Sequence, residues 1–129
     1  MADTVTKTAV SEWLDGYVKA WKTYDKEAIG ALFSEDVVYY DAPYQEPVKG
    51  RAALVASWLE QPDKAGTYDA HYEPVLIEGD RVVTNGRSQY FEQDGKTLKK
   101  EYDNIFLLQF DAQGQCKEYR EWYMERPKK

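Results

Sequence analysis

The chain has 129 residues, of which 43% are hydrophobic and 31% charged, and its formal net charge at pH 7 is −6. This balance is typical of one globular domain with a substantial core, and it excludes an intrinsically disordered chain. The acidic balance, without any basic stripe, argues against a nucleic-acid partner. No segment approaches the roughly 18 apolar residues of a membrane span, which argues against a membrane partner. A lone Cys116 excludes a disulfide framework and fits a reducing compartment, so we expect a cytoplasmic protein.

The first half of the chain carries three helical patterns. Apolar residues spaced i, i+3, i+4 and i+7 predict a first helix over Thr8–Tyr24. Asp25 is a suitable N-cap for a second helix over Lys26–Phe33. A third helix is predicted over Arg51–Gln61, where Pro62 ends the pattern.

Five segments rich in β-branched and aromatic residues are predicted to be strands. They are Val37–Asp41, Thr67–Ile77, Arg81–Glu92, Thr97–Phe110 and Cys116–Met124. Helices followed by a meander of long strands predict an α+β fold. We expect a single domain, residues 1–129, in which a cone-shaped, curved antiparallel sheet wraps around the N-terminal helices.

Alternation along the fourth predicted strand indicates which side chains point into the cone. Its even-numbered set is the more apolar, so we expect this set to face inward, with the amide of Asn104 between Tyr102 and Phe106. The third predicted strand is not cleanly apolar on either face. From alternation alone, Arg87 faces solvent or a partner protomer. For the last strand, alternation does not decide which of the two faces points inward.

The stretch VVYYDAPYQEPVKGR, residues 37–51, places the carboxylate of Asp41 at the end of an aromatic strand. A carboxylate framed in this way is a candidate for acid–base chemistry. The alternative is that Asp41 only shapes the Pro-containing turn that follows it. The chain is also rich in Tyr and Trp, with 11 and 4 copies, and these residues suit a pocket lining as well as a core.

Three segments, in this order and spacing, resemble the nuclear transport factor 2-like superfamily and particularly its SnoaL-like members. The segments are YVKAWKTYDKEAIGALFSEDVVYYD, PVKGRAALVASW, and FDAQGQ followed by EYREWY. The resemblance covers Trp13 to Met124, nearly the whole chain. It implies the cystatin-like version of the α+β cone, a fold that carries many enzymes and many binding-only proteins.

Within the superfamily, the chain is similar to ketosteroid isomerases. That family uses an Asp base at the end of the first strand, with a Tyr and a protonated Asp as the oxyanion hole. The similarity implies that Asp41 is the base and Tyr17 the oxyanion Tyr. Phe106 stands in place of the protonated Asp, and Trp58 stands where the family keeps a supporting Tyr.

The chain is also similar to limonene epoxide hydrolases, which use an Asp-Arg-Asp set and hold a water with a Tyr and an Asn. This similarity implies that Arg87 matches the Arg and Glu121 the carboxylate of the last strand. Gln89 stands in place of the remaining Asp. Tyr39 and Asp41 match the Tyr and Asn positions.

Both similarities imply the same inward faces. Arg87 and Gln89 would point into the cone, with Glu121 opposite and Asn104 between them. His71, the only His of the chain, would also point inward. The alternative for His71 is a surface or structural residue.

The resemblance therefore implies a protein with a small-molecule pocket, and a metal-free, cofactor-free acid–base enzyme. It would be an isomerase, cyclase or hydrolase acting on a small hydrophobic molecule, a carbonyl or polycyclic compound. The expected catalytic residues are Asp41, Tyr17, Glu121, Arg87 and His71. The expected ligand-binding residues are Asn104, Phe106, Trp58, Tyr102, Gln89, Tyr39 and Tyr123.

Two alternatives remain beside the enzyme. The first is a module that binds a ligand without turning it over. The second is a homodimerisation module, compatible with either function, that pairs the outer faces of two sheets. The residues expected on that outer face are Ile105, Leu107, Tyr119 or Trp122.

Overall fold

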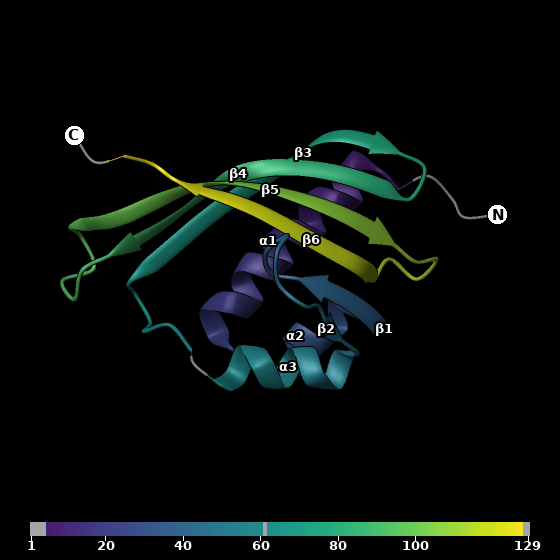
Figure 1. Cartoon of the computed structure of the whole chain (residues 1–129), viewed down its shortest axis with the longest axis horizontal. Helices are drawn as coiled ribbons and strands as arrows, with labels where there is room; N and C mark the ends of the chain where they lie inside the picture. Colours follow the sequence, from purple (N-terminus) through teal and green to yellow (C-terminus); the bar gives the residue numbers. More distant parts are fainter. Residues whose placement is uncertain (1–4, 61, 128–129) are drawn as a thin grey trace.

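The computed structural model describes residues 5–60 and 62–127, which form helices packed against one sheet (Figure 1). The helices are α1 (Lys7–Thr23), α2 (Lys26–Ala31) and α3 (Arg51–Glu60). The strands are β1 (Phe33–Tyr40), β2 (Val48–Lys49), β3 (Tyr68–Glu78), β4 (Arg81–Phe91), β5 (Leu98–Phe110) and β6 (Cys116–Glu125). Within these ranges, no helix has the length and hydropathy to cross a membrane.

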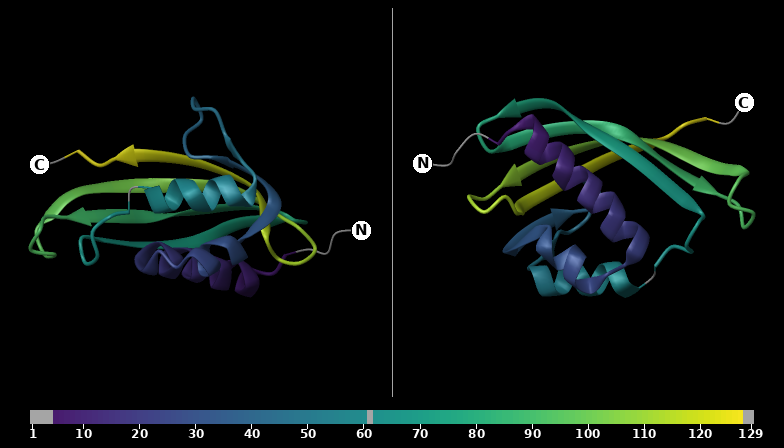
Figure 2. Two further views of the ribbon diagram at one scale, coloured as in Figure 1. Left: turned by 90° about the horizontal axis from the view of Figure 1, so that it is seen from below. Right: turned by 180° about the vertical axis from the view of Figure 1, so that it is seen from behind.

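The strands form one six-stranded sheet in the order β2-β1-β6-β5-β4-β3. Neighbouring strands are antiparallel except β1 and β6, which run parallel. The long strands curve over the helices, which gather on one side of the sheet (Figures 1 and 2). The predicted α+β fold is confirmed. The short strand β2 was not predicted, because two residues carry no periodic signal.

The predicted elements are confirmed with small changes at their ends. Helix α1 begins after the N-cap Thr6 and ends at Tyr24, whose φ of 50° is left-handed. Asp25 caps α2 as predicted, through hydrogen bonds from two backbone amides. Helix α2 ends before Phe33, because this residue begins β1 instead. The predicted end of α3 at Gln61 lies outside the described residues.

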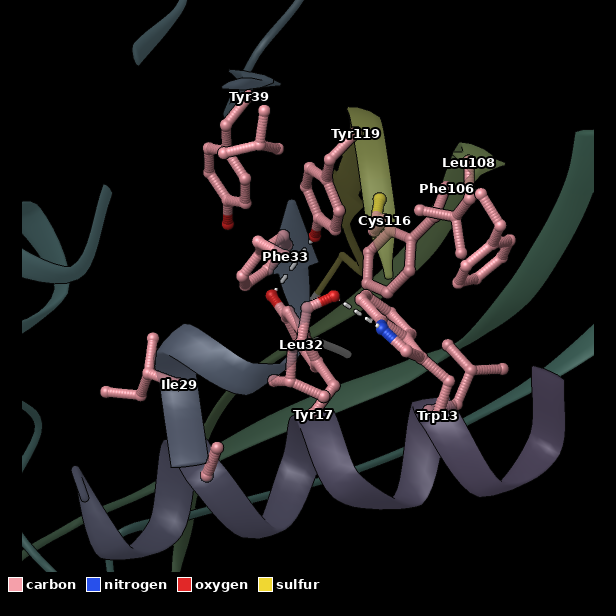
Figure 3. Close-up of a cluster of buried hydrophobic side chains, with 14 of the residues drawn as sticks. Trp13, Tyr17, Ile29, Leu32, Phe33, Tyr39, Phe106, Leu108, Cys116 and Tyr119 are labelled. Atoms are coloured by element: carbon pink, nitrogen blue, oxygen red, sulfur yellow. Dashed lines mark hydrogen bonds between the residues drawn. The ribbon is translucent and has the colours of Figure 1, made fainter. Parts of the chain in front are cut away.

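The core lies between α1 and the inner face of the sheet (Figure 3). Helix α1 buries Val10, Trp13, Leu14, Tyr17 and Ala20. Trp13 reaches toward the sheet, and its Nε1 donates to the carbonyl oxygen of Leu32 over 2.9 Å. As predicted, the even set of β5 faces inward, and it buries Asn104, Phe106, Leu108 and Phe110.

The inner face of β4 is the even set, contrary to what the family similarities imply. Val82, Thr84 and Ser88 are buried, so Arg87 and Gln89 point to the outer face. There the guanidinium of Arg87 lies 3.9 Å from carboxylates of both Glu101 and Asp103, and Gln89 donates to Glu101 over 2.8 Å. The expected inward positions of Arg87 and Gln89 are therefore wrong, and the solvent-facing position of Arg87 that alternation favours is confirmed.

The inward position expected of His71 is also wrong. Strand β3 buries the rings of Tyr68 and Tyr72, and His71 is exposed on the opposite face, where it pairs in register with Arg87. A large apolar ring gains more from burial than an imidazole, so the tyrosines take the inner face. The alternative prediction, that His71 is a surface residue, is confirmed.

The outer face of the sheet exposes two large apolar residues that are cross-strand partners. Ile105 of β5 is 47% exposed and Trp122 of β6 is 41% exposed. Leu107 is partly buried on the same face. The outer-face position expected of Tyr119 is wrong, because its side chain is fully buried on the inner face.

Candidate functional site

A pocket of about 440 Å³ opens between the helices and the inner face of the sheet, a size typical of small-molecule sites. Most of its lining is aromatic: Tyr17, Trp21, Tyr24, Tyr39, Trp58, Tyr72, Tyr90, Tyr102 and Tyr123. The rest of its lining is polar or charged: Asp41, Ser57, Asp63, Ser88, Lys100, Asn104 and Glu121. The pocket therefore combines aromatic rings with a substantial polar surface, which includes groups capable of proton transfer.

Glu121 is the central titratable group of the pocket. After the irregular start of β6, its odd-numbered residues Tyr119, Glu121 and Tyr123 face inward, which turns the carboxylate of Glu121 toward the cavity. Oε1 accepts a hydrogen bond from the hydroxyl of Tyr119, and Oε2 accepts one from Nδ2 of Asn104, each over 2.8 Å. Burial raises the pKa of Glu121 to about 7, against the opposing effect of these two bonds and with a small contribution from the charge of Asp41. The carboxyl group therefore titrates near neutral pH.

Two further hydrogen bonds hold the partners of Glu121. The hydroxyl of Ser88 donates to Oδ1 of Asn104 over 3.0 Å, which turns the amide so that its Nδ2 faces Glu121. The hydroxyls of Tyr17 and Tyr119 lie 3.1 Å apart. Because Tyr119 gives its proton to Glu121, the proton of this second bond comes from Tyr17. The chain of bonds thus joins α1, β4, β5 and β6 around one carboxylate.

Burial keeps the tyrosines beside Glu121 neutral. The rings of Tyr39 and Tyr119 stack with centroids 4.2 Å apart and an interplanar angle of 8°. Burial, and then neighbouring groups that include Glu121, raise the pKa of Tyr17, Tyr39 and Tyr119 well above the ordinary value. Figure 3 shows their three hydroxyls converging between α1 and the sheet.

Asp41 lies at the exposed mouth of the same pocket, just after the end of β1. Its carboxylate accepts no hydrogen bond from the turn that follows, among the residues that the structure describes. Partial burial raises the pKa of Asp41 above its ordinary value. Asp41 thus belongs to the turn after β1, as the turn interpretation predicts. Its side chain also lines the cavity, as the pocket interpretation predicts.

The structure brings most of the predicted site residues to this one pocket. Those that line it are Tyr17, Tyr39, Asp41, Trp58, Tyr102, Asn104, Glu121 and Tyr123. Arg87, Gln89 and His71 lie on the outer face, away from it. Phe106 is fully buried in the core, where its ring packs against Tyr17, Tyr72 and Tyr119 rather than lining the cavity. The roles of the lining residues stay predictions.

Several lining residues were missed in the sequence. Trp21 and Tyr24 belong to the apolar stripe that predicts α1, but that stripe does not separate core from pocket. Lys100 lies on the inward set of β5, so alternation could have found it. Asp63 follows α3 in a segment without any periodic pattern, and only the folded chain brings it to the pocket.

Solved structures with the same architecture share little sequence with this chain. A provisionally assigned ketosteroid isomerase from Kribbella flavida has a TM-score of 0.70 and 18% identity, covering 100% of this chain and 85% of its own. An LEH-like epoxide hydrolase from M. tuberculosis has a TM-score of 0.66 and 14% identity, covering 92% and 84%. An NTF-2 like protein of unknown function from Burkholderia xenovorans has a TM-score of 0.70 and 15% identity, covering 95% and 88%. At such identities the likeness shows the fold alone.

None of the curated proteins matches the chain significantly. The sequence pattern of the SnoaL-like domain matches residues 14–119, which is most of the chain. The matched segment runs from the buried face of α1 to Tyr119, beside Glu121. The chain therefore belongs to the SnoaL-like domain family and has the nuclear transport factor 2-like fold.

Proposed function

We propose that the protein is an acid–base enzyme that moves a proton within a small, largely hydrophobic carbonyl compound, with Glu121 as the proton-transfer group. The observation that carries the proposal is the setting of Glu121, whose carboxylate has two neutral donors and no ion pair within residues 5–60 and 62–127. Proton transfer is most effective when the pKa of the catalytic group lies near the working pH. A carboxyl with a pKa of about 7 meets this condition.

The proposed reaction uses the ionised form of Glu121. Its carboxylate takes a proton from a carbon next to the substrate carbonyl, and the negative charge develops on the carbonyl oxygen. A hydroxyl of the lining, such as that of Tyr102 or Tyr90, donates a hydrogen bond to this oxygen. The protonated Glu121 then returns the proton to the same carbon or to a conjugated one.

Asp41, the base expected from the sequence, takes a secondary role in this proposal. It lies at the solvent-exposed mouth, where water screens its charge, whereas Glu121 lies deeper among the tyrosines. The two carboxylates share the pocket, and the charge of Asp41 helps to raise the pKa of Glu121. Asp41 therefore contributes only weakly to the pKa of the base, which burial sets.

The competing function is binding without turnover. It is favoured by one observation: each oxygen of Glu121 already accepts a hydrogen bond from the protein. Buried polar groups commonly satisfy one another for structural reasons alone. In that case the pocket would hold a ligand while Glu121 stayed inert.

Proton exchange in D2O tests the proposal without knowledge of the natural substrate. Cyclic aryl ketones such as 2-tetralone are incubated with the protein, and loss of the α-proton signal is followed by NMR. We expect the wild-type protein to accelerate exchange and Glu121→Gln to reduce that acceleration by about 100-fold or more. Glu118→Gln is the matched control, because Glu118 lies on the outer face of the same strand, paired with Arg120.

Two outcomes would contradict the proposal. Ketones that bind to the wild-type protein without any acceleration of exchange would identify the binding module. Exchange that survives in Glu121→Gln but is lost in Asp41→Asn would move the base to Asp41.

A further inference from the structure

The pocket is unbalanced in charge. Among the residues that the structure describes, its lining carries the carboxylates of Asp41, Asp63 and Glu121 and one cationic side chain, Lys100. None of these three carboxylates takes part in an ion pair within the described ranges. An anionic ligand entering this cavity meets like charge, whereas a cationic one is attracted.

The part of the pocket around Asp63 is built from aromatic rings. The ring centroids of Trp21 and Tyr90 lie 6.0 Å apart. Nε1 of Trp21 and the hydroxyl of Tyr24 both donate to Oδ2 of Asp63, over 3.1 and 3.3 Å. Its other oxygen, Oδ1, accepts no hydrogen bond from the described residues. The carboxylate of Asp63, an exposed residue, is thus held against aromatic rings at the solvent-facing side of the pocket.

The chain already places an ammonium group on neighbouring rings. Nζ of Lys100 lies 5.3 Å from the ring centroid of Tyr90 and 5.5 Å from that of Tyr102. These distances are typical of cation–π contacts, in which the negative face of the ring attracts a positive charge. The rings of Tyr90 and Tyr102 are therefore already in contact with a cation, Lys100, with which a cationic ligand at Tyr90 would compete.

We propose that the pocket binds organic cations: hydrophobic molecules whose protonated amine or quaternary ammonium group lies among Trp21, Tyr24 and Tyr90 against Asp63. This inference names the substrate class of the proposed enzyme. It rests on the proposed function only for the proton transfer, which would take place at the carbonyl end of the ligand. Binding of the cation depends on the rings and carboxylates alone.

Three naphthalene probes that differ in charge test the binding. They are (2-naphthylmethyl)trimethylammonium, the neutral 2-(2-naphthyl)ethanol and the anionic 2-naphthylacetate, and their affinities are measured by calorimetry. We expect the ammonium to bind about tenfold more tightly than the alcohol, and the acetate to bind most weakly. Equal affinity of the ammonium and the alcohol, or tightest binding of the acetate, would overturn the proposal.

Two substitutions have opposite expected effects on the ammonium probe. Asp63→Asn keeps an acceptor oxygen for Trp21 and Tyr24 but removes the charge, so we expect a loss of about fivefold for the ammonium and none for the alcohol. Lys100→Met removes the competing cation, so the ammonium should bind more tightly. Weaker ammonium binding in Lys100→Met would overturn the proposal.

Two controls complete the test. Asp15→Asn removes the same charge from an exposed position of α1 outside the pocket, and it should leave all three affinities unchanged. Glu121→Gln should keep the preference for the ammonium probe while it loses proton exchange. A protein that prefers the ammonium probe but exchanges no ketone protons would refute the proposed reaction and leave the cation site standing. The reverse result would refute the cation site alone.

Discussion

Asn104 donates from Nδ2 to Oε2 of Glu121 over 2.8 Å, from one strand to the next. In the register of β5 and β6, Asn104 pairs with Tyr123 and Glu121 pairs with Phe106, so the two are diagonal neighbours on the inner face. An amide gives the carboxylate a hydrogen bond without a positive charge. An Arg at this position would instead hold the pKa of Glu121 low.

Replacing Asn104 should therefore move the titration of Glu121. In Asn104→Ala the carboxylate loses a bond that favours its charged form, so we expect the pKa of Glu121 to rise above about 7. NMR titration of ¹³C-labelled glutamate carboxyls would measure this change. Asn85→Ala, on the exposed outer face of β4, is the matched control. An unchanged or lower pKa in Asn104→Ala would contradict the assigned contact.

The raised pKa of Glu121 also makes the fold less stable at higher pH. Its folded-state pKa of about 7 exceeds its ordinary value of 4.5, so the folded chain holds this proton more tightly than the unfolded chain. This contribution is fully present below pH 4.5 and is lost as the pH rises to about 7. The loss amounts to at most about 3 kcal/mol in the free energy of unfolding.

Urea denaturation at pH 5 and pH 8 would measure the effect. We expect the wild-type protein to lose stability over this interval and Glu121→Gln to lose clearly less. Glu118→Gln should retain the wild-type dependence. A Glu121→Gln variant with the full wild-type loss would show that another group is responsible.

Tyr119 links Glu121 to Tyr17, and its hydroxyl should matter more than that of Tyr17. Tyr119→Phe removes one bond to Glu121 and leaves the buried Tyr17 hydroxyl without its partner. We expect a loss of about 1–3 kcal/mol in the free energy of unfolding. Tyr17→Phe leaves the Tyr119 bond to Glu121 intact and should cost less. Urea denaturation of both variants at one pH would show which loses more free energy of unfolding. Equal losses would contradict the larger role of the Tyr119 hydroxyl.

Gly86 allows β3 and β4 to approach closely. A Cβ at this position would overlap the carbonyl oxygen of His71 and lie 2.6 Å from Cα of Tyr72. Because these backbone atoms cannot move aside, we expect Gly86→Ala to lower the free energy of unfolding by at least about 3 kcal/mol. Gly16→Ala is the contrasting variant: its Cβ would lie 3.5 Å from Leu32, and we expect it to gain about 0.5–1 kcal/mol in α1. Thermal melting of both variants tests this, and a Gly86→Ala variant of wild-type stability would contradict it.

The homodimer stays a prediction, and the exposed pair Ile105 and Trp122 is its candidate interface. Such a patch on a sheet face is typical of an interface, and we expect Trp122→Ser to shift the protein toward monomer. Analytical ultracentrifugation at micromolar concentration would measure the mass. Leu76→Ser removes another exposed apolar side chain, from β3, and should leave the mass unchanged. A monomeric wild-type protein would refute the expectation.

The fold was predictable because its strongest elements carry their periodicity in local sequence. The stripe of α1 and the even set of β5 each bury one face, and the burial is as expected. The start of β1 was missed, because Ser34, Glu35 and Asp36 interrupt the apolar pattern just where the pairing with β6 is irregular.

The site was less predictable because it depends on which face of each strand turns inward. In β4, neither set is cleanly apolar, and the family similarities favoured the set that carries Arg87. Alternation along the strand was the better guide, because it favoured a solvent-facing Arg87. On the outer face the guanidinium lies beside two carboxylates. Asp63 could not be found at all, because its contact with Trp21 joins α1 to the segment after α3.

The position of β6 has a consequence for synthesis of the protein. Strand β6, the last of the described strands along the chain, is inserted between β1 and β5 and carries Glu121 and Tyr119. Until β6 emerges from the ribosome, β1 and β5 each present an unpaired edge, and the nascent chain holds a half-built pocket without its base. Completion of the sheet and acquisition of the proposed chemistry are thus the same late event, and a chain truncated before β6 would lack the proposed base and be prone to aggregate.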